Sequence, residues 1–175
     1  MSVDPRYPIG KFVPPQVMTP GVRQEMIEIV AATPAKVREA VAGLNSAQLD
    51  VPYREAGWTV KQVVHHLADS HLNAYTRFKL ALTEDNPMVK PYDETAWAEL
   101  ADSVTTPVET SVVLLETLHT RWVNLLRSMS EADFHKTYRH PDYGARTLDQ
   151  LLALYAWHGP HHVAHITELR KRMGW

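Results

Sequence analysis

The 175-residue sequence contains no cysteine. Without thiols the chain cannot form disulfides, thiolate metal sites, iron–sulfur clusters or a cysteine nucleophile. A long apolar run is also absent, because the longest, 151–157, is far shorter than the roughly 20 residues that span a bilayer. Residues 1–11 lack the apolar core of a secretion signal. These absences favour a cytoplasmic protein that is not embedded in a membrane.

Neither sign of charge is in excess. Lys and Arg total 18 and Asp and Glu total 20, which gives a net charge of −2 with His neutral. This balance offers no electrostatic reason to expect nucleic acid or an anionic membrane as a partner. Hydrophobic residues make up 45% and charged residues 22%, which is typical of a globular protein. At roughly 100–200 residues per domain, we expect one domain over residues 1–175.

Apolar residues recur at helical spacing in four long segments, and no segment shows the alternation of a strand. The predicted helices are 22–44, 60–83, 107–129 and 148–173. Capping boxes mark two of the starts, at Thr59 with Gln62 and at Thr147 with Gln150. Pro34 predicts a kink or a break in the first helix.

The connections between these helices are uneven in length. Residues 1–20 hold five prolines and are expected to form an extended arm. Residues 84–107 and 130–146 are long connections, and the latter carries the turn sequence of residues 140–144. The pattern therefore predicts an all-α four-helix bundle whose connections are longer than tight turns.

Histidine is abundant, with ten residues in the chain. Seven of them form two groups, one in the second predicted helix and one in the last. The groups are His65, His66 and His71, and His158, His161, His162 and His165. Because cysteine is absent, clustered imidazoles are the natural ligands for zinc, nickel, copper or iron.

The last helix carries two i,i+4 histidine pairs. At 100° per residue, His162 lies within about 40° and His158 within about 60° of the centre of the buried face, so their rings can converge on one ion. His165 and His161, at about 80° and about 120°, are predicted to point outward. Pro160 lies between the better pair and either sets the angle between their imidazoles or marks a tolerated kink.

Two histidines do not make a sound metal site, so a third ligand is needed. His66 shares a polar stripe with Gln62 and Asp69, which suits the wall of a cleft. His71 lies at the centre of the apolar face, where a histidine is usually a hydrogen-bonded core residue. The pattern of residues leaves His66 and His71 level, with His65 behind them.

Other metal and catalytic motifs fit poorly. Glu116 and His119 form one E-x-x-H motif, but a di-iron bundle requires two, and His119 is therefore expected on the helix surface or in a pocket. Residues 161–165 depart from the zinc-protease H-E-x-x-H motif because His162 replaces the general base. The chain has no G-x-S-x-G, P-loop or G-x-G-x-x-G motif.

Several blocks of the sequence resemble the YfiT-like branch of the DinB superfamily over essentially the whole chain. The blocks are 6–12 (RYPIGKF), 57–71 (GWTVKQVVHHLADSH), 77–84 (RFKLALTE), 155–166 (YAWHGPHHVAHI) and 172–175 (RMGW). The resemblance implies a four-helix bundle with up-down-down-up connectivity, a homodimer and one divalent ion per subunit, most often zinc and sometimes nickel. It also implies three ligands, His66, His158 and His162.

A three-histidine site with an open position is typical of catalytic metal centres. Bound water with a pKa near ~7 would support hydrolysis of an ester, an amide or a similar small-molecule substrate, and the YfiT-like branch is described as metal-dependent hydrolases. Related branches use thiols, so the alternative is S-transfer from a low-molecular-weight thiol such as bacillithiol, mycothiol or glutathione. A non-catalytic metal-binding stress protein is the third possibility. Asp69, His71 and His161 are the candidates for a general base.

Overall fold

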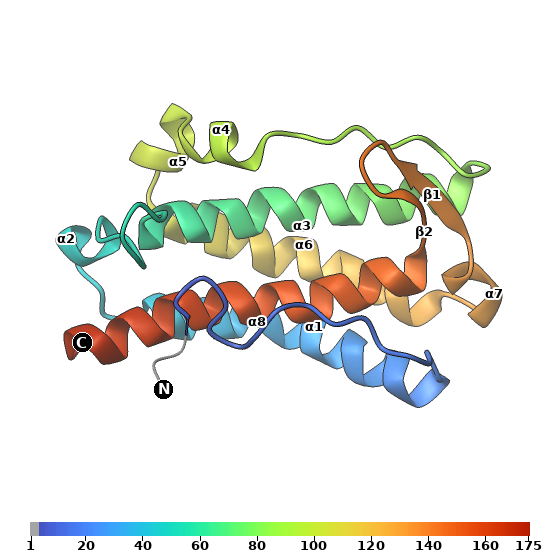
Figure 1. Cartoon of the computed structure of the whole chain (residues 1–175), viewed down its shortest axis with the longest axis horizontal. Coiled ribbons are helices and arrows are strands. Elements are labelled where there is room, and N and C mark those ends of the chain that lie inside the picture. The colour runs from blue at the N-terminus through green and yellow to red at the C-terminus, as the bar shows by residue number, and fades with distance from the viewer. Residues whose placement is uncertain (1–3) are drawn as a thin grey trace.

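Four long helices form a bundle in the computed structural model, which describes residues 4–175. They are α1 (Pro20–Val41), α3 (Val60–Thr83), α6 (Val108–Ser128) and α8 (Leu148–Met173). Helices α1 and α3 each pack against both α6 and α8. In Figure 1, α3 and α6 run in one direction while α1 and α8 run in the other. The predicted all-α bundle and its up-down-down-up connectivity are therefore confirmed.

Local capping places α3 and α8 where the sequence predicts them, whereas α1 begins two residues before and ends three residues before the predicted 22–44. The Thr59 hydroxyl accepts a hydrogen bond from the Gln62 backbone N–H, and the Gln62 side chain accepts one from the Thr59 N–H. Thr147 and Gln150 form the same reciprocal pair at the start of α8. Gly174 ends α8 in the left-handed conformation, with φ 71°, which glycine adopts without strain.

The connections contain short elements that the sequence pattern did not fully predict. They are α2 (Ser46–Leu49), α4 (Glu94–Ala98), α5 (Ala101–Thr105), α7 (Glu131–Phe134), β1 (Thr137–His140) and β2 (Gly144–Thr147). The two strands form an antiparallel hairpin, so the expectation of no strand was wrong. Each strand has only four residues, too few for an alternating pattern to stand out. The predicted turn at residues 140–144 joins them.

Helix α1 runs through Pro34 without a break, contrary to one of the expected outcomes. A proline has no N–H to donate to the carbonyl four residues earlier, which here belongs to Val30. The Nδ1 atom of His119 on α6 lies 2.8 Å from that carbonyl oxygen. A side chain from a neighbouring helix thus replaces the hydrogen bond that Pro34 removes.

A layer of polar side chains divides the core across the middle of the bundle. One apolar cluster contains Phe78 and Trp122, and the other contains Val64 and Leu115. The residues between them include Thr33 of α1, Ser70 and His71 of α3, His119 of α6, and His158, Gly159 and His162 of α8. A Cβ atom on Gly159 would lie 2.7 Å from the Thr33 side chain. Glycine therefore permits the close approach of α1 and α8 at this layer.

Residues 4–19 lie along α8 and α1 before α1 begins (Figure 1). The expected arm of residues 1–20 ends one residue early, because Pro20 is the first residue of α1, and residues 1–3 are outside the described part. The Phe12 ring lies 5.9 Å from Trp157, and the Tyr7 ring lies 6.2 Å from His161. The arm thus covers one side of α8. Within residues 4–175, no helix is both long and apolar enough to cross a membrane.

Candidate metal centre

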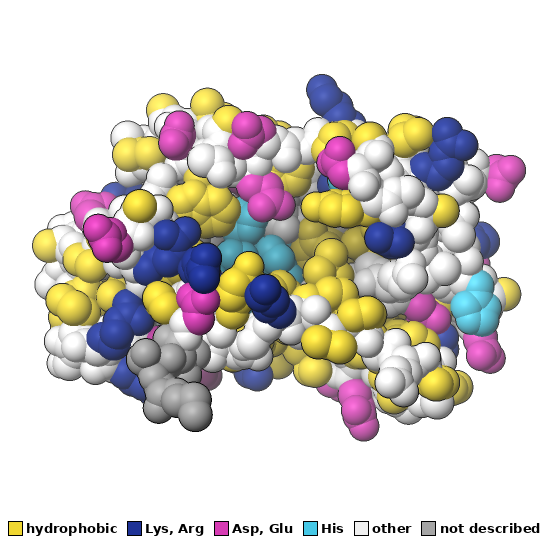
Figure 2. Space-filling view, viewed as in Figure 1, with side chains coloured by type: hydrophobic (Ala, Val, Ile, Leu, Met, Phe, Trp, Pro, Cys, Tyr) yellow, Lys and Arg dark blue, Asp and Glu magenta, His cyan; other side chains and the backbone are white. Residues whose placement is uncertain are grey.

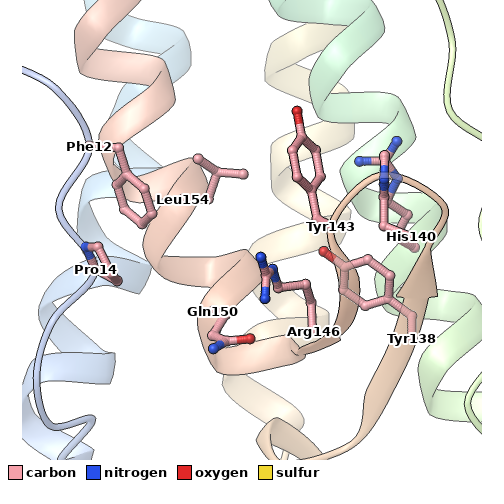
Figure 3. A pocket seen from close by; sticks show the side chains of 9 residues that line it. Phe12, Pro14, Tyr138, His140, Tyr143, Arg146, Gln150 and Leu154 are labelled. Carbon is pink, nitrogen blue, oxygen red and sulfur yellow. The ribbon is translucent and has the colours of Figure 1, made fainter.

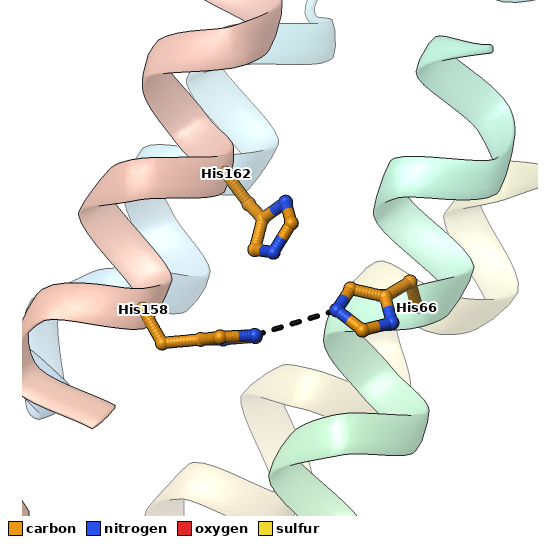
Figure 4. Close-up of side chains that lie close together, drawn as sticks. All are labelled: His66, His158 and His162. Carbon is orange, nitrogen blue, oxygen red and sulfur yellow. Dashed lines mark hydrogen bonds between the residues drawn. The ribbon is translucent and has the colours of Figure 1, made fainter. Parts of the chain in front are cut away.

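Three histidines from two helices converge at the polar layer. His66 of α3 and His158 and His162 of α8 each place one ring nitrogen so that all three atoms lie within 4.8 Å of one another. The Nε2 atoms of His66 and His158 are 3.3 Å apart, and Figure 4 shows the His162 ring turned toward the same space. The structure thus brings together the three residues that the resemblance implied, including His66, which the residue pattern left level with His71.

A chain of hydrogen bonds behind His158 determines which of its nitrogens carries the proton. The Val30 carbonyl can only accept, so the Nδ1 of His119, 2.8 Å away, is the donor. The Nε2 of a neutral His119 then accepts from His71 Nδ1 at 2.8 Å. By the same logic, His71 Nε2 accepts from His158 Nδ1 at 3.3 Å. The His158 Nε2 is therefore left with a lone pair, and this is the atom that faces His66.

A shorter chain of hydrogen bonds determines which nitrogen of His162 carries the proton. The Nε2 of His165 lies 3.3 Å from the Arg6 carbonyl oxygen and must be the donor. The Nδ1 of His165 then accepts from His162 Nδ1, also at 3.3 Å. The Nε2 of His162 consequently has a free lone pair. Two backbone carbonyls, one on α1 and one on the N-terminal arm, orient the two α8 imidazoles.

Both chains of hydrogen bonds require uncharged imidazole rings, and burial keeps the rings uncharged because it lowers their pKa. Burial lowers the pKa of His66 and of His119 to about 4. Burial also lowers the pKa of His158 and His162 well below the ordinary value. These imidazoles are consequently uncharged at neutral pH, which is the form that binds a metal ion. His66 is packed against Trp58, with ring centroids 4.6 Å apart.

The prediction that His161 and His165 point outward was wrong. Their side chains are buried, because the arm and the segment before α3 cover that side of α8. Tyr53 stacks on His165 with ring centroids 4.0 Å apart, and Trp157 stacks on His161 at 4.2 Å. Helical periodicity places a residue on a face of its helix, but it carries no information about what covers that face.

A cleft of about 560 Å³ leads to the convergent rings. It is lined from α8 by His158, His161, His162, Tyr155 and Trp157, and by residues of α3, the 91–95 segment and the hairpin turn. Figure 2 shows histidine side chains at the base of a hollow near the centre of the molecule. The three-histidine site is therefore open to solvent on one side.

The general-base candidates occupy different places. His161 lines the cleft, and its buried Nδ1 has no hydrogen-bond partner among the described residues. His71 is fully buried behind His158. Asp69 is half-buried, and burial raises its pKa to about 6, but it does not line the cleft. The polar stripe that contains it faces α4, where Gln62 donates to the Ala98 carbonyl.

Packing within the bundle determines where His119 and His65 lie. His119 is buried rather than on the helix surface, because it satisfies both Val30 and His71 inside the bundle, and it lines a cavity between α1 and α6, as the other expected outcome had it. His65 is held 2.7 Å from the Ser111 hydroxyl and 3.0 Å from the Thr106 carbonyl. These contacts direct His65 toward α5 and α6, away from the convergent rings.

The cleft also contains polar residues that the sequence did not single out. Arg77 lines it from α3, Tyr92 lines it from the long connection before α4, and Glu94 lines it from the first position of α4. The Tyr92 hydroxyl is buried without a partner among the described residues. Burial raises the pKa of Glu94, and the charge of Arg77 partly opposes that rise. Tyr92 lies in an irregular connection without periodicity, and α4 has only five residues, too few for a pattern to stand out, so no sequence signal marked Tyr92 or Glu94.

Residues 29–166 match the sequence model of the DinB superfamily. Together with the helical bundle, this match shows that the chain belongs to the DinB superfamily.

Relatives extend the match over nearly the full length. "Putative metal-dependent hydrolase YfiT" of Bacillus subtilis (strain 168) is 50% identical over 175 residues, covering 99% of this chain and 98% of the relative. A protein of Bacillus cereus (strain AH820), also named a putative metal-dependent hydrolase, is 54% identical over 172 residues, or 98% of this chain and 99% of the relative. The solved structure of Bacillus subtilis YfiT, described as a probable metal-dependent hydrolase with an unusual four-helix bundle topology, superposes with a TM-score of 0.96 at 49% identity and covers 99% of both chains.

Proposed function

We propose that the chain is a metal-dependent hydrolase of small-molecule substrates in which His66, His158 and His162 hold one divalent cation. The observation that carries the proposal is the convergence of three neutral imidazoles, from two helices, at the base of an open cleft. The names of the relatives support the same class of activity.

The donor atoms fit such an ion. Two nitrogens bound to a tetrahedral zinc at about 2.0–2.1 Å would lie about 3.3–3.4 Å apart. The Nε2 atoms of His66 and His158 are 3.3 Å apart, and the hydrogen-bond chains leave lone pairs on the Nε2 atoms of His158 and His162. Imidazole ligands suit zinc and nickel. We propose zinc as the resident ion and nickel as an effective substitute.

His66, His158 and His162 would hold the cation, and the cleft gives water and substrate access to it. A divalent cation held by these residues would supply a water of lowered pKa, near ~7, and would polarise a substrate carbonyl. Trp157 and Tyr155 form walls beside the ligands, and they limit the water that reaches the substrate. His161 is the candidate proton acceptor, since its neutral ring lines the cleft and is held by stacking on Trp157.

Metal content tests the ligand set directly. The protein would be loaded with zinc, passed through a desalting column and analysed by mass spectrometry for metal. We expect about one zinc per chain, retained by a His135→Ala control because His135 is exposed. Alanine at His66, His158 or His162 should abolish retention. Unchanged metal content in these three variants would refute the proposed ligands.

Activity assays separate the possible functions. The zinc-loaded protein would be incubated with 4-nitrophenyl esters and anilides, and separately with monochlorobimane in the presence of bacillithiol, mycothiol or glutathione. Hydrolysis without any thiol supports the proposal. Thiol-dependent conjugation without hydrolysis would assign thiol S-transfer instead. Tight metal binding with neither reaction would favour a non-catalytic metal-binding protein.

A further inference from the structure

A second cavity, of about 290 Å³, adjoins the cleft that leads to the three histidines. Four residues line both spaces, Arg77, His140, Tyr143 and Leu154. Because the two spaces have a common wall, a ligand whose reacting group sits beside the histidines can extend its other end into this cavity.

The charged side chains that line this second cavity are both arginines. Arg77 of α3 and Arg146 of β2 line it, and no Asp or Glu does. Neither guanidinium forms an ion pair within residues 4–175. Two unpaired arginines at one cavity indicate a site for an anion that is not part of this chain.

Both arginines act on the same small region of the cavity. Burial raises the pKa of Tyr138, and the charges of Arg77 and Arg146 oppose that rise. Burial lowers the pKa of His140, the charges of Arg77 and Arg146 lower it further, and Asp142, whose carboxylate is 3.7 Å from His140 Nδ1, opposes them. The two positive charges therefore reach the same pair of side chains. Figure 3 shows Arg146, Tyr138 and His140 around this cavity.

We propose that this cavity is an anion subsite that binds a carboxylate or phosphate group at one end of the substrate. Phe12 and Leu154 line the cavity and provide apolar surface for the body of the ligand. In contrast, three acids, Asp93, Glu94 and Asp142, line the cleft beside the histidines against a single arginine, Arg77, and this excess of acids disfavours a second negative charge there. This distribution of charge orients the substrate, with its anionic end at the arginines and a neutral ester or amide group toward the three histidines.

The substrate orientation rests on the proposed hydrolase activity, so the first test uses two esters with the same leaving group. Mono-4-nitrophenyl glutarate ends in a carboxylate, and 4-nitrophenyl pentanoate ends in a methyl group. In each reaction water adds to the ester carbonyl, and 4-nitrophenolate leaves with the electron pair of the broken C–O bond. We expect the zinc-loaded protein to show a KM for the glutarate ester that is lower by about ten-fold or more, the size of a charge-assisted interaction.

Substitutions identify the groups responsible. Arg146→Met and Arg77→Met should each bring the ratio of the two KM values close to one, because this ratio cancels any effect that a substitution has on both esters alike. Arg139→Met is the matched control, because Arg139 is exposed and lies between Tyr138 and His140 on the opposite face of β1. Equal KM values for the two esters in the unmodified protein, or a preference that survives both Arg77→Met and Arg146→Met, would overturn the subsite.

A binding measurement separates failure of the subsite from failure of the hydrolase proposal. Glutarate and methyl phosphate would be titrated into the metal-free protein while the arginine Nε–H signals are followed by NMR. We expect shifts of the Arg77 and Arg146 signals that saturate with glutarate, with methyl phosphate, or with both, which also identifies the preferred anion. Saturable shifts without ester turnover would retain the subsite and reject ester hydrolysis. No shift with either anion would reject the subsite whatever the turnover.

Discussion

Replacing His119 with leucine tests whether the chain of histidines behind His158 supports the metal centre. The substitution leaves two buried groups without partners, the Val30 carbonyl, which Pro34 already deprives of its helical donor, and the Nδ1–H of His71. Each unpaired buried group costs about 1–3 kcal/mol. We therefore expect the free energy of unfolding of the metal-free protein to fall by roughly 2–6 kcal/mol, measured by urea denaturation.

The same substitution should weaken metal binding without touching a proposed ligand. Once His71 loses its acceptor, nothing holds His158 in the form that directs its Nε2 lone pair into the site. Loss of such an outer hydrogen bond typically costs 10–100-fold in metal affinity, so we expect a loss of about that size in zinc competition against a chelator. Long-range ¹H–¹⁵N NMR of the metal-free protein should show His158 protonated at Nδ1, and this preference should weaken in His119→Leu.

Two control variants make the test specific. His119→Gln has both a donor and an acceptor, so it should restore most of the affinity and the Nδ1–H form of His158. His135→Leu changes an exposed histidine and should alter neither. The reasoning would be refuted if folded His119→Leu bound zinc as tightly as the unmodified protein, or if the unmodified protein carried the His158 proton on Nε2.

Three further predictions concern packing, charge and pH. Gly159→Ala should destabilise the protein by about 1–3 kcal/mol through overpacking against Thr33. The double variant Gly159→Ala, Thr33→Ala should regain melting temperature, and a failure to regain it would argue against that contact. Asp149→Asn should cost about 3–5 kcal/mol in urea denaturation, because Arg23 and Asp149 form a buried pair with N–O distances of 2.8 and 2.9 Å; a cost below about 1 kcal/mol would contradict burial of the charge. Between pH 6.5 and 4 the unfolded chain binds more protons than the folded one, because burial lowers the pKa of His66 to about 4. The metal-free protein should therefore lose stability as the pH falls through this window, by about 1.4 kcal/mol per pH unit for each such histidine, and denaturation curves independent of pH there would contradict neutral buried rings.

Interactions between residues close in the chain were predictable from the sequence. The capping boxes of Thr59 and Thr147 depend on a partner three residues away, and the pairing of His158 with His162 depends on one turn of helix. Backbone geometry alone determines such contacts. For the same reason, the bounds of α3 and α8 and the better histidine pair of α8 were predictable before any packing was known.

The remaining features depend on how distant segments pack. Whether His66 or His71 faces the α8 pair is decided by the rotation of α3 against α8, and no local pattern determines that rotation. His119 reaches Val30 across 89 residues of chain, and His165 reaches Arg6 across 159. Tertiary structure therefore determined which histidines converge, which ones orient them and which surfaces the arm covers, because burial and hydrogen bonding between helices arise only when the bundle assembles.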